Sequence, residues 1–169
     1  GSWNLYRAAL DLDGKISKDG NLLYRLNLAA QNKGSFRANE FNDRYSVAPV
    51  LSYKVDDKTR LTLEYVWQHA KMSDVGSFYV FSADGFGTLP YDFSFLPAGL
   101  APTIIDDHSV SLNLQHQLSR NWKFTAQTAY YSYVQNGSSM WPSAVNADGT
   151  VLRSVGSWDA KSDMRFFQA

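Results

Sequence analysis

The 169-residue sequence lacks cysteine, long apolar runs and net charge, and each absence excludes a class of protein. Without cysteine there can be no disulfide bonds and no thiolate metal sites. No stretch approaches the roughly 18 consecutive apolar residues that a transmembrane helix requires. The 16 basic and 16 acidic residues balance each other, which removes the electrostatic argument for binding nucleic acid.

In place of long apolar runs, the sequence places apolar residues at every second position. From Ser109 to Leu118 the odd-numbered residues are polar, and the even-numbered residues are valine, leucine or one histidine. Side chains of a β-strand alternate between two faces, so this stretch has one polar and one apolar face. A tilted strand of about 9–11 residues is long enough to cross a bilayer.

The same alternation predicts six antiparallel strands and the beginning of a seventh. Polar turns near residues 17–21, 56–59 and 119–121 separate the members of each pair, and Asp19-Gly20 is a typical hairpin signal. Pro49 predicts a bulge or distortion in the third strand, because proline cannot donate a hydrogen bond. The strands are expected at residues 4–15, 22–32, 45–55, 60–72, 107–118 and 122–134, with the seventh starting at 164–169.

The connections alternate in length along the chain. Long polar or glycine-rich and proline-rich loops are expected at residues 32–44, 73–106 and 135–163, opposite the short turns. Within the last of these, Val151 to Val155 is a candidate strand that extends above the membrane. Short turns on one side and long loops on the other are typical of a transmembrane β-barrel. A soluble sandwich also alternates along its strands but seldom sorts its loops by side. The predicted fold class is therefore all-β, an antiparallel transmembrane β-barrel segment.

The polar face carries charges that a narrow barrel could not bury. A small barrel fills its interior with side chains, and burying unpaired charge is costly, so these residues predict a wide lumen. Arg25 is expected opposite Asp11 or Asp13, depending on the register of the first hairpin, and the charges can simply pair with one another. The charged residues of this face are Arg7, Asp11, Asp13, Arg25, Lys54 and Glu64.

Nothing in the sequence predicts catalysis or a bound metal. His69, His108 and His116 lie on different predicted strands without the close spacing of a metal site. No serine, histidine and acid fall together as a triad would require. The chain is predicted not to be an enzyme and to need no cofactor.

Several short motifs follow one another in a specific order and spacing, and together they cover most of residues 1–118. The motifs are Gly1-Ser2-Trp3, Tyr6-Arg7-Ala8, Leu10-Asp11, Tyr24-Arg25-Leu26-Asn27-Leu28-Ala29, Ser35-Phe36-Arg37, Arg44-Tyr45, Ala48-Pro49-Val50-Leu51-Ser52-Tyr53, Thr59-Arg60-Leu61-Thr62-Leu63-Glu64-Tyr65, Leu89-Pro90 and Ile105-Asp106-Asp107-His108. In this order and spacing they resemble TonB-dependent siderophore receptors of the ferrichrome and ferrioxamine type.

The resemblance implies a barrel of about 22 strands in the outer membrane of a Gram-negative bacterium, with a plug domain inside it. It also implies import of a ferric siderophore, so that iron enters only within the bound chelate. Contact with TonB would come from an N-terminal part that this sequence lacks. Residues 1–169 are therefore expected to be a partial barrel domain, without the plug domain and the remaining strands.

The aromatic residues of 73–106, with Trp141 beyond them, are the candidate ligand contacts. Aromatic walls could hold the organic shell of a chelate, although such rings also pack loops and form girdles at the membrane interface. Asp74, Asp84, Asp92 and Asp106 would favour neutral or cationic chelates. The candidates are Phe78, Tyr79, Phe81, Phe86, Tyr91, Phe93, Phe95 and Trp141.

Two other functions stay open on the sequence alone. A passive porin or structural barrel protein would share the alternating strands, but the aromatic content of 73–106 favours a receptor. A soluble all-β binding module would share them too, and would not need detergent.

Overall fold

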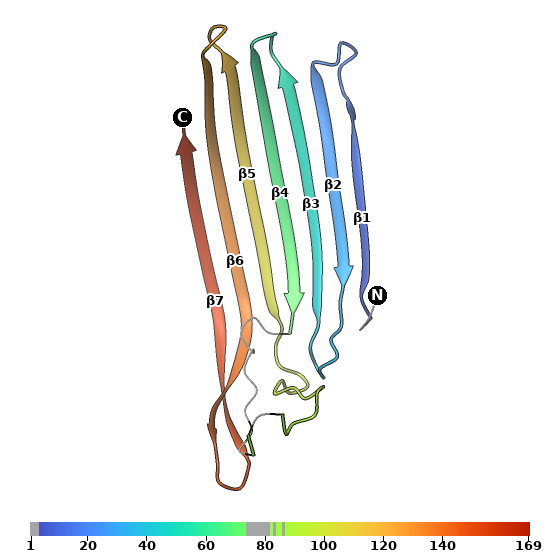
Figure 1. Ribbon diagram of the computed structural model, residues 1–169, viewed down its shortest axis with the longest axis vertical. Helices are drawn as coiled ribbons and strands as arrows, with labels where there is room; N and C mark the ends of the chain where they lie inside the picture. The colour runs from blue at the N-terminus through green and yellow to red at the C-terminus, as the bar shows by residue number, and fades with distance from the viewer. Residues whose placement is uncertain (1–3, 74–81, 83, 86) are drawn as a thin grey trace.

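The computed structural model describes residues 4–73, 82, 84, 85 and 87–169, and its strands form one antiparallel sheet. Neighbours in sequence are neighbours in the sheet, in the order β1 to β7 (Figure 1). None of the described residues forms a helix long and apolar enough to cross a membrane. The strands are β1 (Tyr6–Lys15), β2 (Leu22–Asn32), β3 (Asn42–Lys54), β4 (Thr59–Met72), β5 (Thr103–Gln117), β6 (Lys123–Val145) and β7 (Val151–Gln168).

The predicted all-β antiparallel fold is confirmed, and the short turns lie together at one end of the sheet (Figure 1). Aspartates order these turns by accepting backbone hydrogen bonds. Asp56 accepts the amide of Lys58 at 2.7 Å and Asp19 accepts the amide of Asn21 at 3.1 Å. The hydrogen bond from the Lys58 amide stabilises the ionised carboxylate of Asp56 and is the main reason that its pKa lies below the usual value.

The third long loop is the main correction to the prediction. Residues 135–163 are not a loop. The strand β6 is 23 residues long and ends only at Val145, and the 18-residue strand β7 runs back beside it from Val151. Only residues 146–150 turn, where the amide of Asn146 donates to the carbonyl of Thr150 at 2.8 Å. The strand signal there was obscured by Gly137, Pro142 and several serines, which weaken strands unless a partner strand pairs with them.

The fifth strand also begins earlier than predicted, at Thr103 rather than residue 107. Ile104, Ile105 and Asp106 pair with β4, opposite Lys71, Ala70 and His69. The loop between β4 and β5 is therefore shorter than 73–106 and ends before Thr103.

Pro49 interrupts one ladder without shifting its register. β3 pairs with β4 through Val47 opposite Trp67 and resumes at Val50 opposite Glu64, so Ala48 and Pro49 are skipped. The expected distortion is a local gap of two pairs and not a bulge. This follows from the missing amide hydrogen of proline, which removes one ladder bond.

The register aligns the apolar residues of successive strands on one face. Leu51, Leu63 and Leu112 lie opposite one another across β3, β4 and β5. Each is at least 40% exposed, which a protein surrounded by water avoids for a whole row of leucines. This face is the one that suits contact with lipid.

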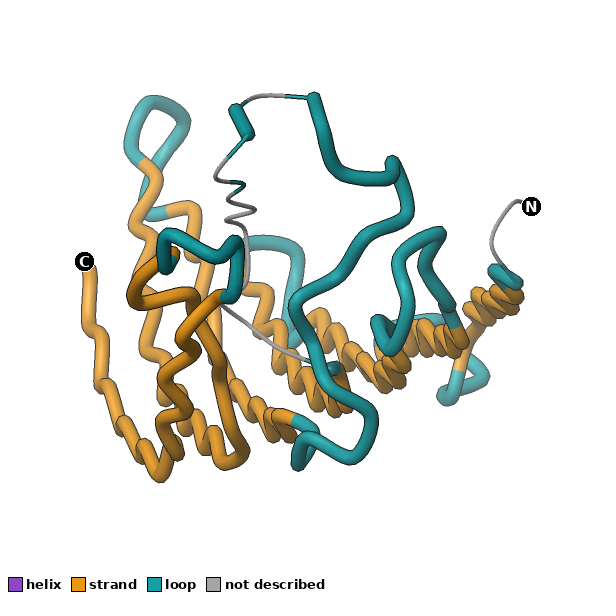
Figure 2. The backbone as a smooth tube through the Cα atoms, turned by 90° about the horizontal axis from the view of Figure 1, so that it is seen from below, coloured by secondary structure: helices purple, strands orange, loops and turns teal. Residues whose placement is uncertain are grey.

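The opposite, polar face is the concave one. Seen from below, the sheet curves, and the described residues that lead into β5, 87–102, run across its hollow side (Figure 2). Ala70 and Met72 belong to the polar set of β4 and are nevertheless only 8% and 7% exposed. They are buried because the loops cover this end of the concave face.

Gly137 marks the point where the β6–β7 hairpin continues past β5. Its φ is 143°, and an added Cβ would lie 2.4 Å from the Cα of Thr103. No other residue has room for this approach, because the backbone of Pro102 and Thr103 occupies the position of a side chain. The hydroxyl of Thr103 donates to the carbonyl of Ser138 at 3.2 Å across the same contact.

We expect Leu112→Arg to lower the free energy of unfolding of the barrel by about 2–4 kcal/mol, which is a loss of stability typical of a cation near the middle of a bilayer. Ser111→Arg should cost much less, since it faces the lumen and lies opposite Glu64. Urea unfolding in lipid vesicles measures both values. Equal losses would contradict the assignment of the two faces.

We expect Gly137→Ala to be more destabilising than Gly149→Ala, which separates steric overlap from backbone conformation. Both glycines have positive φ, but a Cβ on Gly149 would meet nothing within 4 Å. Gly149→Ala should cost about 1–2 kcal/mol for the left-handed backbone alone. Gly137→Ala should cost about 1–3 kcal/mol more through overlap with Thr103. The same unfolding measurement applies, and equal costs would argue against the close approach.

Candidate ligand-binding mouth

The loop end of the sheet is built around a small apolar cluster. Phe95, Leu96 and Met140 are buried, and Phe93, Leu100 and Val151 pack against them. The cluster joins the described residues before β5 to the far part of the β6–β7 hairpin, which extends past the other strands (Figure 1). We call this end the mouth: the described residues between β2 and β3, those between β4 and β5, and the hairpin beyond Gly137.

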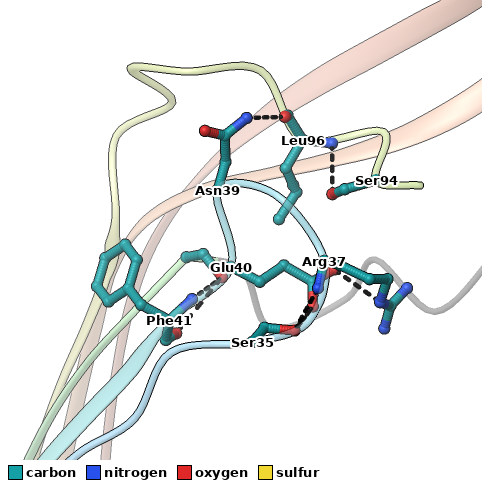
Figure 3. A network of polar contacts seen from close by, with 8 residues as sticks. Ser35, Arg37, Asn39, Glu40, Phe41, Ser94 and Leu96 are labelled. Carbon is teal, nitrogen blue, oxygen red and sulfur yellow. Dashed lines mark hydrogen bonds and ion pairs between the residues drawn. The ribbon is translucent and has the colours of Figure 1, made fainter. Parts of the chain in front are cut away.

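Two side chains from different elements hold consecutive carbonyls of the β4–β5 segment. Arg153 of β7 donates from Nη1 to the carbonyl of Phe95 at 2.7 Å. Asn39, between β2 and β3, donates from Nδ2 to the carbonyl of Leu96 at 2.8 Å (Figure 3). These bonds fix the position of the segment over the concave face.

The β2–β3 loop is itself held by a local polar network (Figure 3). The hydroxyl of Ser35 donates to Glu40 at 3.0 Å, and the amide of Arg37 donates to Ser35 at 3.1 Å. Arg37 and Glu40 form an ion pair of 3.2 Å. At the base of the loop the amide of Ser73 donates to the carbonyl of Phe41 at 3.1 Å, which ties β2–β3 to the end of β4.

An aromatic stack joins the two loops. The rings of Phe36 and Tyr91 lie 4.7 Å apart and 8° from parallel, and the guanidinium of Arg37 lies 5.7 Å from the centre of the Phe36 ring. Beside this stack is a pocket of about 310 Å³, whose walls include Phe36, Arg37, Pro90, Tyr91 and Phe93. Its aromatic surface and single guanidinium suit an organic ligand with a polar group.

The predicted aromatic contacts divide into three groups. Phe78, Tyr79, Phe81 and Phe86 lie outside the described residues. Tyr91 is 69% exposed at the pocket, whereas Phe95 is 6% exposed and meets Phe93 edge-on at 5.0 Å. The structure thus brings Tyr91 and Phe93 to one pocket and uses Phe95 to anchor the segment. Their contact with a ligand stays a prediction.

Trp141 does not lie in a loop, contrary to the prediction. It belongs to β6, pairs with Ser154 of β7 and is 43% exposed. Its ring lies over Gly156, where an added Cβ would be 3.0 Å away. Trp141 therefore reaches the mouth as part of a rigid hairpin rather than a loop.

One of the four aspartates predicted to give the mouth an acidic bias lies elsewhere. Asp106 is in β5 on the apolar face, where its carboxylate lies 2.8 Å from Nδ1 of His69. Asp74 lies outside the described residues. Asp84 and Asp92 remain exposed in the β4–β5 segment. The structure thus removes Asp106 from the predicted set, and the effect of the other aspartates on chelate charge stays a prediction.

Arg25 on the concave face pairs with an aspartate of β1, as the alternation of the first hairpin predicted. Arg25 has Asp13 as its direct neighbour across the ladder, yet it donates diagonally to both oxygens of Asp11, at 2.9 and 2.6 Å. Ser111 and Glu64 are 3.4 Å apart. The sequence left Asp11 and Asp13 as alternatives, and the structure shows Asp11 as the partner of Arg25.

The three histidines pair individually and do not gather. His69 meets Asp106, His108 lies 2.7 Å from the hydroxyl of Tyr65, and His116 lies 2.9 Å from that of Thr59. Within the part of the chain that the structure describes, no group of three His, Asp or Glu side chains could hold a metal ion.

Sequence reasoning missed the β2–β3 loop as part of the site. Phe36, Arg37 and Asn39 line or hold the pocket, but no periodicity marks them because they lie between strands. The available signal was the aromatic–basic pair Phe36-Arg37 in a loop otherwise polar. Its partner Tyr91 is distant in sequence, so only the fold could bring them together.

Comparison with known proteins places this architecture among receptors. The chain is 30% identical over 154 residues to the metal-pseudopaline receptor of Pseudomonas aeruginosa, which is 90% of this chain and 22% of that receptor. It is 25% identical over 174 residues to the ferric-pyoverdine 358 receptor of Pseudomonas putida, covering 98% of this chain and 21% of that receptor. No protein-family profile matches the chain.

Solved structures show the same fold. The outer-membrane ferripyoverdine receptor of P. aeruginosa, bound to ferripyoverdine, superposes with a TM-score of 0.79 at 20% identity. It is matched over 98% of this chain and 23% of its own length. The ferric-catecholate import receptor of E. coli, in its open form, gives a TM-score of 0.76 at 18% identity, over 97% of this chain and 28% of its own.

The relatives and structural neighbours are TonB-dependent outer-membrane receptors. The predicted outer-membrane location is thereby confirmed. The relatives are receptors and not enzymes. The chain spans about a fifth of the length of the curated relatives it matches.

Proposed function

We propose that residues 1–169 are part of the barrel wall and outer loops of a transporter that imports metal chelates of the ferric siderophore kind. The kinship with chelate receptors over 90% of the chain is the observation that carries this proposal. The remaining strands, a plug domain and the segment that contacts TonB would belong to the rest of the protein. The narrower assignment to ferrichrome or ferrioxamine stays a prediction.

The mouth has the surface that such a function needs. Aromatic rings can bind the organic shell of a chelate by burying apolar area, so no side chain has to coordinate the metal. Tyr91 stacks on Phe36 beside a pocket on the hollow side of the sheet, where a ligand entering the lumen would pass. The loops are tied together by Asn39 and Arg153, so the pocket wall is formed before a ligand arrives.

A passive pore is the competing function for the same barrel wall. Import through a TonB-dependent receptor needs cellular energy, whereas diffusion through a pore does not. Cells that carry the full-length protein but lack TonB should therefore take up no ferric chelate above background. Uptake at the same rate with and without TonB would support the pore.

We expect the triple variant Tyr79→Ala, Tyr91→Ala and Trp141→Ala of the full-length receptor to bind ferric chelates at least about tenfold more weakly. Each buried ring contributes on the order of 1–2 kcal/mol through its area. Isothermal titration in detergent measures the affinity for a panel of ferric chelates that the parent binds. Single variants should each show part of the loss.

Tyr53→Ala is the matched control, since Tyr53 is 46% exposed on the apolar face near the short turns. It should leave chelate affinity unchanged. A triple variant that binds as tightly as the parent would show that these rings are structural and that the ligand site lies elsewhere.

A further inference from the structure

Two arginines face the lumen just below the mouth. Arg7 of β1, Gln31 of β2 and Arg44 of β3 lie opposite one another in a single cross-strand row on the concave face. Neighbouring strands are about 4.8 Å apart, so the two arginine Cα atoms are separated by about 10 Å. Side chains as long as arginine can converge on one group bound between them.

The carboxylates near this row either lie on the opposite face of the sheet or are already bonded to another side chain. Asp11, the nearest acid on β1, accepts hydrogen bonds from Nε and Nη2 of Arg25. Asp43 lies on the apolar face, where Asn32 donates to it at 2.6 Å, and Asp106 is bonded to His69. Asp107 of β5 faces the lumen, but it pairs with Gln68 in the next row, two strands from Arg44.

Neither arginine has a carboxylate within ion-pair distance among the described residues. The ion pairs that the structure shows there join Arg25 to Asp11, Arg37 to Glu40, Lys54 to Asp57 and His69 to Asp106. Arg44 is oriented by donating from Nε to the side-chain oxygen of Asn42 at 2.7 Å, which leaves its terminal nitrogens for another acceptor. Both arginines are exposed.

The wall beneath them is hollowed. Two adjoining pockets, of about 150 and 330 Å³, share Arg7, Ala29 and Ser46 in their lining. Arg44, Gln31 and Gln68 also line the first, and Asn27 lines the second. The small side chains form a floor, and guanidinium, amide and hydroxyl groups surround it. The carboxylate of Asp11 also lines the second pocket, where it is already bonded to Arg25. Such a site presents hydrogen-bond donors to an anion and has room for it.

We propose that Arg7 and Arg44 bind an anionic group of the ligand, a carboxylate borne by the chelate, as it moves from the mouth into the lumen. This inference rests on the proposed function and narrows it to anionic chelates. The planar guanidinium forks of both residues suit bidentate recognition of a carboxylate. The mouth pocket would hold the organic shell of the same ligand, and the two arginines its negative charge.

The test uses the full-length receptor and two ferric trihydroxamate chelates that differ at one position. One carries a free carboxylate and the other the corresponding methyl amide. The parent receptor should bind the carboxylate form more tightly. Arg7→Gln with Arg44→Gln should weaken binding of the carboxylate form about 10–100-fold, as for the loss of hydrogen bonds to a charged group, and should leave binding of the amide form unchanged.

Arg60→Gln is the matched control. Arg60 lies on the same face, opposite Lys54 at the short-turn end, and is far from the row along the strand. It removes one positive charge from the lumen without touching the proposed site, and it should affect neither chelate. Arg44→Lys should retain part of the affinity, since the charge stays while the fork is lost.

Each other outcome overturns the inference in a distinguishable way. Equal weakening of both chelates, or none, would show that the arginines do not read the carboxylate. A double variant that lowers the stability of the ligand-free receptor and leaves the preference for the carboxylate unchanged would show that they pair with an acidic side chain of the receptor itself. A parent receptor that binds no ferric chelate at all would refute the proposed function, and this inference with it.

Discussion

The structure depends on one constraint: backbone amide and carbonyl groups that face lipid must bond to one another, because no water is present to bond with them. A continuous antiparallel ladder meets this requirement, and β1 to β7 form one without a crossover. The ladder tolerates Pro49 because the loss is confined to two pairs and the register resumes. The same ladder determines which side chains meet lipid and which meet the lumen.

Because of that ladder, the two faces of the sheet carry different kinds of side chain. The apolar face carries rows of leucines and aromatic rings such as Leu51, Leu63 and Leu112, and polar pairs such as Asn32–Asp43 and His69–Asp106 lie at its mouth end. The concave face can carry polar groups because the lumen admits water. Its charged residues differ from one end of the strands to the other. Arg7 and Arg44 lie nearest the mouth, Arg25 and Asp11 form a closed pair further along, and Lys54 and Arg60 lie at the short turns.

The mouth solves a different problem, because loops there have no ladder to fix them. A cluster of Phe95, Leu96 and Met140, with side-chain bonds from Asn39 and Arg153, does this instead. The extended β6–β7 hairpin supplies Met140 to the cluster, and it can pass β5 only because Gly137 lacks a side chain. The position of the aromatic pocket thus depends on Gly137 and on a few contacts between segments that are far apart in the sequence.

The sequence by itself determined the strand faces, the short turns and the resemblance to receptors, because a period of two residues is a local property. It could not determine the β6–β7 hairpin, whose glycine and serines are strand-like only when a partner strand pairs with them. Nor could it show that Arg25 bonds to Asp11, that Phe36 stacks on Tyr91, or that Arg7 and Arg44 share a row. Those contacts depend on register and on loop packing, which only the tertiary structure decides.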